Sequence, residues 1–492
     1  MRKLTNIGLI FLLFSCEIYA QNFYPDLSVP TSRFGESVTI NNNWMAVGAP
    51  MDDENGVESG AVYLYKKVND EWIHFTKVLG EENSMSQFGG MVVLNGDLLY
   101  ISAVNKNANN LIVGAVYVYK FNGTTWVFEK EIQPENLSDG AKFGQFISIS
   151  NGTVMISAPE QVVQMSVSGV VYAFDETNNW QEEFQLSSNT PLDVEQFGKF
   201  IHVDDTWLTI SAFRDLAGYK VGQVNIYRND SLGWNLIQQE EGNLFDKKYL
   251  GRSVDVLGDL MVIGATYSIT PNDEIDSGEV SIYRYDSNVN LWNLDNVIHS
   301  PIELGYFGWT TKLIANKLYI GSRFDLASFG YPRGNLYIYF DEGNGYEFQY
   351  RIFDPYNHEN QDFTQSVSFI DDFILIGAPG TEIGEIQYGM VSLHQQKYKL
   401  IINVTGLNNP SEDLLVKETL QNNGAYIPFD MTFSFGYLHT FQDSFQLAIM
   451  ELPKDPNHEC TIDNEYGSFW DPVNILVNIE CTDVDTIFSN TF

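Results

Sequence analysis

Short runs of alternating apolar and polar residues follow one another along most of this chain, with turn-forming residues between them. In the first copy of the pattern, segments 34–40, 44–49, 60–66 and 71–79 have the length of β-strands; 60–66 alternates strictly, and 44–49 is an apolar run with small residues at its end. The triplet Asn41–Asn43 separates the first two segments and has turn chemistry. Because no 3.6-residue helical period intervenes, the pattern predicts four antiparallel strands in this copy.

A Phe-Gly pair marks each copy and sets the period. The pair and its degraded forms are Phe34-Gly35, Phe88-Gly89, Phe143-Gly144, Phe197-Gly198, Leu250-Gly251, Phe307-Gly308 and Phe363-Thr364. The gaps are 54, 55, 54, 53, 57 and 56 residues, which makes seven copies. A small-residue step such as Gly48-Ala49-Pro50 and a glycine-led strand follow each pair. Seven such units predict an all-β fold, a closed seven-bladed β-propeller.

The last copy raises a closure problem. It has strand patterns at 363–370, 373–378 and 389–395 but no aromatic-led fourth strand. Segment 22–29 precedes the first Phe-Gly pair by the distance that separates fourth strands from the next pair elsewhere. We therefore expect 22–29 to complete blade seven, which would cover two open sheet edges.

The N-terminus has the pattern of an export signal. Positively charged Arg2 and Lys3 precede an apolar run, and Ala20 precedes a plausible cleavage point, so residues 1–20 are expected to be a signal peptide. An alternative treats 13–16 as a lipoprotein box in which Cys16 is acylated. No later stretch approaches the ~20 apolar residues of a membrane-spanning helix. The protein is therefore expected to be secreted or attached to the cell surface.

The net charge of the chain excludes some classes of binding partner. The formal net charge is −37, from 27 basic and 64 acidic residues, with no basic cluster to offset it. Such a chain is repelled by nucleic acid and by anionic lipid. The acidity fits a solvated surface on an exported protein, and the alternative is a surface for divalent cations or cationic partners.

The Phe-Gly pairs, the Val-Gly-Ala-Pro of 47–50, the Ile-Gly-Ala-Pro of 376–379 and the Gly-x-Val-Tyr strands together resemble the FG-GAP repeats of the integrin alpha-chain head and its bacterial relatives. The resemblance covers about residues 22–396. It implies a propeller over 21–396 that serves in adhesion or extracellular recognition.

Integrin-like repeats often hold calcium in an Asp-rich loop before the Gly-Ala-Pro step, but here that interval is a tight turn. None of these turns offers the six or more oxygen ligands that calcium prefers. Acidic residues in the next loop, Asp52, Glu54, Asp273 and Asp276, are weak alternative ligands. We therefore expect no metal and no cofactor.

The tail, residues 397–492, breaks the period. Its Leu-Gln-Asn-Asn-Gly at 420–424 and Cys-Thr-Ile-Asp-Asn at 460–464 are similar to a small β-sandwich module of bacterial surface proteins. An isolated cysteine pair in an exported protein most often forms a disulfide. The resemblance implies that Cys460 bonds to Cys481.

No catalytic motif is present: the chain lacks a nucleophile elbow, a zinc-protease motif, a phosphate loop and a dinucleotide fingerprint. The expected function is therefore non-catalytic recognition or adhesion by a monomer whose propeller face binds an extracellular protein or carbohydrate. Two alternatives remain open. One is a glycan-directed hydrolase with a site at the channel mouth, and the other is a purely structural surface protein.

Overall fold

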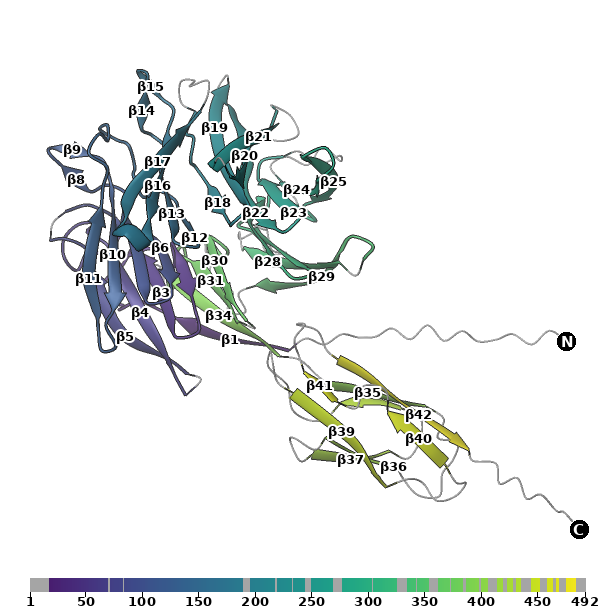
Figure 1. Cartoon of the computed structure of the whole chain (residues 1–492). Coiled ribbons are helices and arrows are strands. Elements are labelled where there is room, and N and C mark those ends of the chain that lie inside the picture. The colour runs from purple at the N-terminus through teal and green to yellow at the C-terminus, as the bar shows by residue number, and fades with distance from the viewer. Residues whose placement is uncertain are drawn as a thin grey trace, which may run out of the picture. The chain divides into compact units, whose positions relative to one another are not determined.

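The computed structural model describes most of residues 17–397 and, within 400–483, the strand backbones (Figure 1). Gaps fall at 70, 83, 189–194, 217–218, 232, 244–248, 269–276, 303, 325–333, 342, 354–361, 372, 384–385 and 398–399, and at further loops beyond 405. Within the described ranges, no helix is long and apolar enough to cross a membrane.

The repeats form seven antiparallel sheets of four strands, so the predicted all-β, seven-bladed propeller is confirmed. Blades one to three consist of β2 (Val38–Ile40), β3 (Trp44–Ala49), β4 (Ala61–Val68) and β5 (Glu71–Leu79); β6 (Phe88–Asn95), β7 (Leu98–Ala103), β10 (Ala115–Phe121) and β11 (Trp126–Ile132); and β12 (Ile147–Ser150), β13 (Thr153–Ala158), β16 (Val170–Asp175) and β17 (Gln181–Ser187).

Blades four to six consist of β18 (Ile201–Val203), β19 (Trp207–Leu216), β20 (Tyr219–Asp230) and β21 (Gly233–Glu241); β22 (Leu250–Leu257), β23 (Leu260–Ala265), β24 (Glu279–Asp286) and β25 (Leu291–His299); and β26 (Phe307–Ile314), β27 (Lys317–Ser322), β28 (Asn335–Asp341) and β29 (Tyr346–Phe353). Blade seven consists of β30 (Ser366–Ile370), β31 (Phe373–Ala378), β34 (Met390–Lys397) and β1 (Glu17–Phe23). Short hairpins β8–β9, β14–β15 and β32–β33 extend from blades two, three and seven; their strands are Asn107–Ala108, Leu111–Ile112, Val162–Val163, Ser166–Val167, Glu382–Ile383 and Ile386–Gln387.

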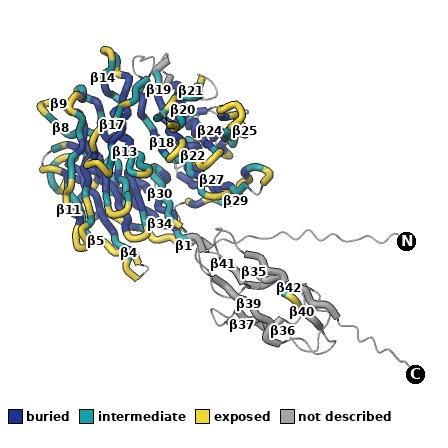
Figure 2. Tube along the Cα trace, in the orientation of Figure 1, coloured by how far each residue is buried: buried dark blue, intermediate teal, exposed yellow. Residues whose placement is uncertain are grey.

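The second strand of each blade lies in the core. All six residues of β3 and of β27 are buried, because a middle strand of a propeller has a neighbouring blade on each face (Figure 2). Aromatic rings fill the space between blades: Trp44 packs edge-on against Trp126 of the next blade at 5.2 Å between ring centroids. Such pairs add stabilisation beyond the area that they bury.

The repeat-defining pair is an inter-blade joint. Phe34, Phe143, Phe197, Phe307 and Phe363 have no exposed surface, and Phe88 is 2% exposed. The backbone of the pair's phenylalanine bridges the glycine that opens the third strand of the preceding blade, as Phe88 does with Gly60 and Phe307 with Gly278. Gly35, Gly89, Gly144, Gly198, Gly251 and Gly308 all have φ between +87° and +93°, whereas Thr364 takes this position in the seventh repeat with φ of +71°. The pairs are therefore structural.

The strand that completes blade seven is β1, which lies beside β34, so the predicted segment 22–29 is corrected to Glu17–Phe23. The two ranges share only residues 22 and 23. The physical reason is a turn: the carboxylate of Asp26 accepts a hydrogen bond from the Ser28 amide, and the Asp26 carbonyl accepts one from the Val29 amide. These bonds end the extended backbone soon after Pro25, which has no amide to donate.

The C-terminal part of the chain contains two further four-stranded sheets. One has the order β38-β35-β42-β40 and the other β37-β36-β39-β41. These strands are β35 (Leu400–Thr405), β36 (Leu414–Glu418), β37 (Asn423–Ile427), β38 (Met431–Ser434), β39 (Ser444–Glu451), β40 (His458–Ile462), β41 (Tyr466–Ser468) and β42 (Ile475–Asp483). The chain divides into two compact units. One contains residues 21–370 and 375–393, and the other contains residues 1–20, 371–374 and 394–492.

Cys460 and Cys481 are directly opposite each other in the antiparallel pair β40–β42. Their side chains lie outside the described residues, and no disulfide is shown, so the bond stays a prediction.

Candidate functional site: the axial cavity

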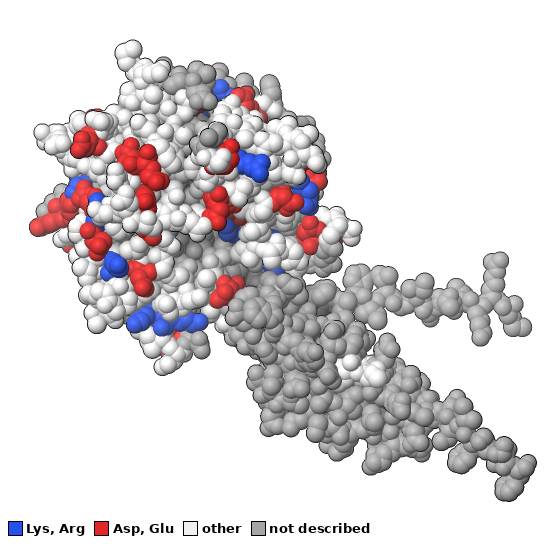
Figure 3. Space-filling view, in the orientation of Figure 1, with Lys and Arg blue, Asp and Glu red and all other residues white. Residues whose placement is uncertain are grey.

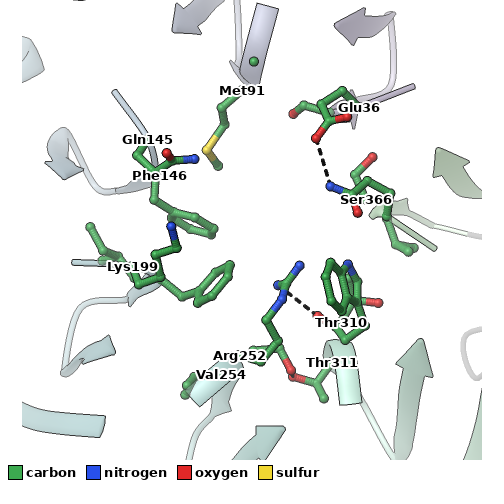
Figure 4. Close-up of a pocket in the computed structure, with 18 of the residues that line it drawn as sticks. Glu36, Met91, Gln145, Phe146, Lys199, Arg252, Val254, Thr310, Thr311 and Ser366 are labelled. Carbon is green, nitrogen blue, oxygen red and sulfur yellow. Dashed lines mark hydrogen bonds between the residues drawn. The ribbon is translucent and has the colours of Figure 1, made fainter. Parts of the chain in front are cut away.

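One position of the repeat supplies a ring of seven residues of six types. The residue after each Phe-Gly pair is either the third residue of its blade's inner strand or lies one or two residues before that strand. These residues are Glu36, Gly90, Gln145, Lys199, Arg252, Trp309 and Gln365. All seven line one cavity of about 710 Å³, together with the residues that follow them, Ser37, Met91, Phe146, Phe200, Ser253, Thr310 and Ser366. Labelled residues from several blades converge on this cavity in Figure 4. The cavity is therefore the axial channel of the propeller.

The carboxylates near the cavity are already compensated. Glu36 lies 2.6 Å from Nη2 of Arg33 and accepts a second hydrogen bond, of 2.9 Å, from Nε2 of Gln365. Asp362 receives a two-pronged contact from Arg323, with Nη2 to Oδ2 at 2.8 Å and Nε to Oδ1 at 3.0 Å. The charges of Arg33 and Arg323 are therefore each balanced by a carboxylate of the protein itself.

Arg252 differs from these two arginines. It forms no ion pair with a carboxylate in the described part of the chain; its Nη1 donates to the carbonyl of Trp309 at 3.2 Å. The guanidinium lies 3.6 Å from the Trp309 ring centroid and 4.5 Å from that of Phe200. Burial, and then the charge of Arg323, lower the pKa of Arg252 to about 9. The group therefore stays protonated at neutral pH, at a cost in desolvation.

Aromatic rings in mutual contact form a wall beside Arg252, which we call the aromatic arc: Phe146, Phe200, Phe213, Tyr249, Tyr267, Tyr306 and Phe324. Successive centroids are 4.5 to 6.0 Å apart. The first five rings line the cavity. Because the arc runs over blades three to six, one side of the cavity is strongly aromatic, while the lining from blades one, two and seven mixes polar with aliphatic side chains.

A second charged group consists of His202, Asp255 and Lys312 on the inner strands of blades four, five and six. Each of these residues follows its blade's ring residue by three positions. His202 Nδ1 is 3.2 Å from Asp255 Oδ1, and Lys312 Nζ is 2.8 Å from the same oxygen. The Leu313 amide donates to Asp255 Oδ2 at 2.7 Å. Burial opposes the charge of His202, but the carboxylates of Asp204 and Asp255 outweigh it and raise the His202 pKa above its ordinary value.

Two of the weak calcium candidates serve another purpose. Asp52 is fully buried, with Oδ2 2.7 Å from Lys77 Nζ and a hydrogen bond from the Tyr63 hydroxyl at 2.9 Å. Glu54 contacts the same ammonium at 2.5 Å. A lysine occupies the place a cation would take, which disfavours a metal there.

The other two candidates, Asp273 and Asp276, lie outside the described residues. Among the residues that the structure does describe, no group of three or more His, Cys, Asp or Glu side chains could hold a metal.

Sequence reasoning found the repeat but missed the cavity residues. Arg252 and Trp309 directly follow the Phe-Gly pair or its degraded form, so their position was visible, but the seven copies place six residue types there, with only Gln occurring twice. That variation at a fixed register is the signal that could have identified them.

The family model described as FG-GAP repeat matches residues 29–65, the first repeat. No curated protein matches the chain. One similar solved structure is described as a "putative 6-phosphogluconolactonase" from Bacteroides uniformis, with 9% identity over 65% of this chain and 85% of that one and a TM-score of 0.42. Another is the polysaccharide lyase Uly1, with 9% identity over 73% of this chain and 89% of that one and a TM-score of 0.45.

The prediction that the protein is not an enzyme is corrected by these two likenesses, since both of those proteins are named as enzymes. A propeller without a familiar sequence motif is no ground for excluding catalysis, because one fold supports many functions.

Proposed function

We propose that this chain is an exported recognition protein that binds an extracellular glycan in the axial cavity of its propeller. The observation that carries the proposal is the aromatic arc along one wall of a cavity of about 710 Å³. Ligand sites are typically concave, rich in aromatic side chains and supplied with a few polar groups, and about 300–1,000 Å³ is their usual volume.

The polar groups of the cavity fit a sugar. Trp309 Nε1 and Gln365 Oε1, on two of the residues that line the cavity, are buried and have no hydrogen-bond partner among the described residues. Unsatisfied donors and acceptors of this kind cost free energy until a ligand pairs with them. A pyranose offers hydroxyl groups at its rim and apolar C–H faces that can stack on the arc.

The proposal includes a location outside the cell. It rests on the apolar run within residues 1–20, with acylation of Cys16 as the alternative anchor, and on the similarity of 397–492 to a sandwich module of surface proteins. We propose that this tail connects or spaces the propeller at the surface.

A glycan array followed by calorimetry tests the proposal. We expect saturable binding of at least one oligosaccharide class and a loss of about tenfold or more in affinity for Trp309→Leu. Phe128→Ala is the matched control, because Phe128 is an exposed ring on the outer strand β11 and should leave affinity unchanged. Binding of a matrix protein but of no glycan would refute the proposal. Turnover of the bound glycan would support the site and add catalysis to it.

A further inference from the structure

We infer that the axial cavity selects an anionic sugar, one that carries a carboxylate or sulfate group, and that Arg252 binds that group. This inference rests on the proposed function and names its ligand class.

The first argument is the uncompensated charge. Burying a cation without a partner is costly, and the cost is normally met by a carboxylate, as Arg33 and Arg323 show at Glu36 and Asp362. The direct contacts of Arg252 in the described part of the chain are a carbonyl and two rings, while the charge of Arg323 opposes its own and Glu36, which is paired with Arg33, attracts it only through space. An anion entering the cavity would supply the missing partner.

The second argument is the orientation of the guanidinium. Phe200 comes from blade four and Trp309 from blade six, so rings from the two adjacent blades flank Arg252. Stacking fixes the plane of the group, which reduces the side-chain entropy lost on binding. One N–H is used by the Trp309 carbonyl, and a guanidinium has five, so donors remain for a two-pronged bond to an oxyanion.

The third argument is the local sign of charge. The chain carries −37 overall, and acidic side chains are scattered over the face of the propeller seen in Figure 3. Among the lining side chains, Arg252 makes no carboxylate contact in the described part of the chain, whereas the carboxylate of Glu36 is paired with Arg33. Because screening at physiological salt limits exposed charges to about 8 Å, the distant surface acids do not cancel this local field.

The aromatic arc favours a sugar over an acidic peptide as the ligand of the cavity. Five rings of the arc line the cavity beside Arg252, and they offer stacking surface for sugar units next to the charged one. An acidic peptide would need backbone partners as well. Edge amides of the inner strands already donate to side chains of the neighbouring blade, as Val92 does to Ser37 Oγ at 3.0 Å and Leu94 to Thr39 Oγ1 at 3.2 Å.

The test compares matched ligands by calorimetry: oligogalacturonate and its methyl ester, a sulfated oligosaccharide and its desulfated form, a neutral cello-oligosaccharide and polyglutamate. We expect at least one acidic ligand to bind about tenfold or more tighter than its neutral partner, and Arg252→Gln to abolish this preference. The Arg252→Lys variant keeps the positive charge but lacks the planar guanidinium. It should therefore retain only part of the preference for the acidic ligand. The carboxylate and sulfate pairs distinguish the two forms of the anion.

Arg284→Gln is the control, because it removes one positive charge from a half-exposed surface pair with Asp295 and should preserve the preference. Melting temperatures establish that each variant is folded. Equal binding of acidic and neutral partners would overturn the inference while leaving the glycan proposal intact. Binding of no sugar would overturn both, and tighter binding of polyglutamate than of any sugar would assign the cavity to acidic peptides instead.

Discussion

Phe34 of the first repeat and Gly389 of the seventh form a parallel β-bridge, the same joint that links Gly60 to Phe88 and Gly278 to Phe307 between neighbouring blades. The two residues are 355 positions apart in the chain. Because the joint between last and first repeats is the same as the joints between successive ones, the propeller closes without a special seam on its inner side.

Gly389→Ala should open this joint. Gly389 has φ of +87°, and an added Cβ would lie 2.2 Å from the Phe34 carbonyl oxygen. We expect a loss of more than about 3 kcal/mol in the free energy of unfolding, measured by chemical denaturation. Gly123→Ala is the matched control: its φ is +95°, with open space around it, so it reports the strain of positive φ alone, about 1–3 kcal/mol. Equal losses in the two variants would contradict the role of Gly389 in closure.

The outer seam depends on β1. The Ser392 hydroxyl donates to Asn22 Oδ1 at 2.7 Å, and the Phe23 ring packs against Tyr65 of blade one at 5.0 Å. A chain that starts at Gln21 lacks four of the seven residues of β1, so we expect it to melt several degrees below one that starts at Glu17. Scanning calorimetry of the two chains measures this, and indistinguishable melting temperatures would remove β1 from the closure.

The same strand bears on N-terminal processing. Cleavage after Ala20 would remove Glu17–Ala20, whereas cleavage before Cys16 would keep all of β1. The closing role of β1 therefore favours the alternative processing over cleavage after Ala20, and on that ground we expect the exported chain to begin at Cys16, with a lipid on that residue. Mass spectrometry of the exported protein checks this, and a chain beginning at Gln21 would contradict it.

The His202–Asp255–Lys312 group predicts a pH dependence. Because the folded-state pKa of His202 is raised, its contribution to stability is complete below the unfolded value of about 6.5 and is lost as pH rises through the folded value. The pKa of Asp255 is lowered despite burial, chiefly by Lys312 and His202, so its contribution is present above about 3.9 and is lost as pH falls through the folded value. Urea denaturation should show that His202→Gln costs more stability at pH 5.5 than at pH 9.

His299 gives the control of opposite sign, because burial lowers its pKa. Removing the His299 side chain should therefore lower the free energy of unfolding least at acidic pH, or even raise it there. The same pH profile for both histidine variants would contradict the assignment.

Lys77 tests the buried pair with Asp52. Lys77→Met leaves a fully buried carboxylate without its cation, and we expect a loss of about 3–5 kcal/mol in the free energy of unfolding. The double variant Asp52→Asn with Lys77→Met should recover much of this loss. Arg284→Met breaks a surface pair and should cost less than about 1 kcal/mol. If Lys77→Met cost no more than the surface variant, the buried pair would not stabilise blade one.

The opposed cysteines predict a disulfide. Residues directly opposite in an antiparallel pair have Cα atoms about 4.5–5.5 Å apart, within the range that a disulfide spans. Intact-mass measurement of the exported protein should show a loss of about 2 Da relative to the reduced chain. Two free thiols in alkylation of the unreduced protein would contradict the bond.

The repeat and its strands could be predicted because they depend on neighbours in sequence. A short apolar run bounded by turn residues, such as 44–49, indicates a buried strand, and a spacing near 54 residues returns that environment in every blade. The first repeat bears this out, with observed strands that differ from the predicted ones by a few residues. The closing strand was misplaced because the turn at Asp26 uses only local hydrogen bonds that alternation does not encode.

The sequence by itself determined an all-β chain with seven units, since period and spacing are local properties of the chain. Only the tertiary structure decided which side chains meet on the axis and which charges remain unpaired there. Arg252 is without a carboxylate because Glu36 and Asp362, 216 residues before and 110 after it, are held by Arg33 and Arg323. Such compensation depends on distances in space, which the closed ring sets and the order of residues does not.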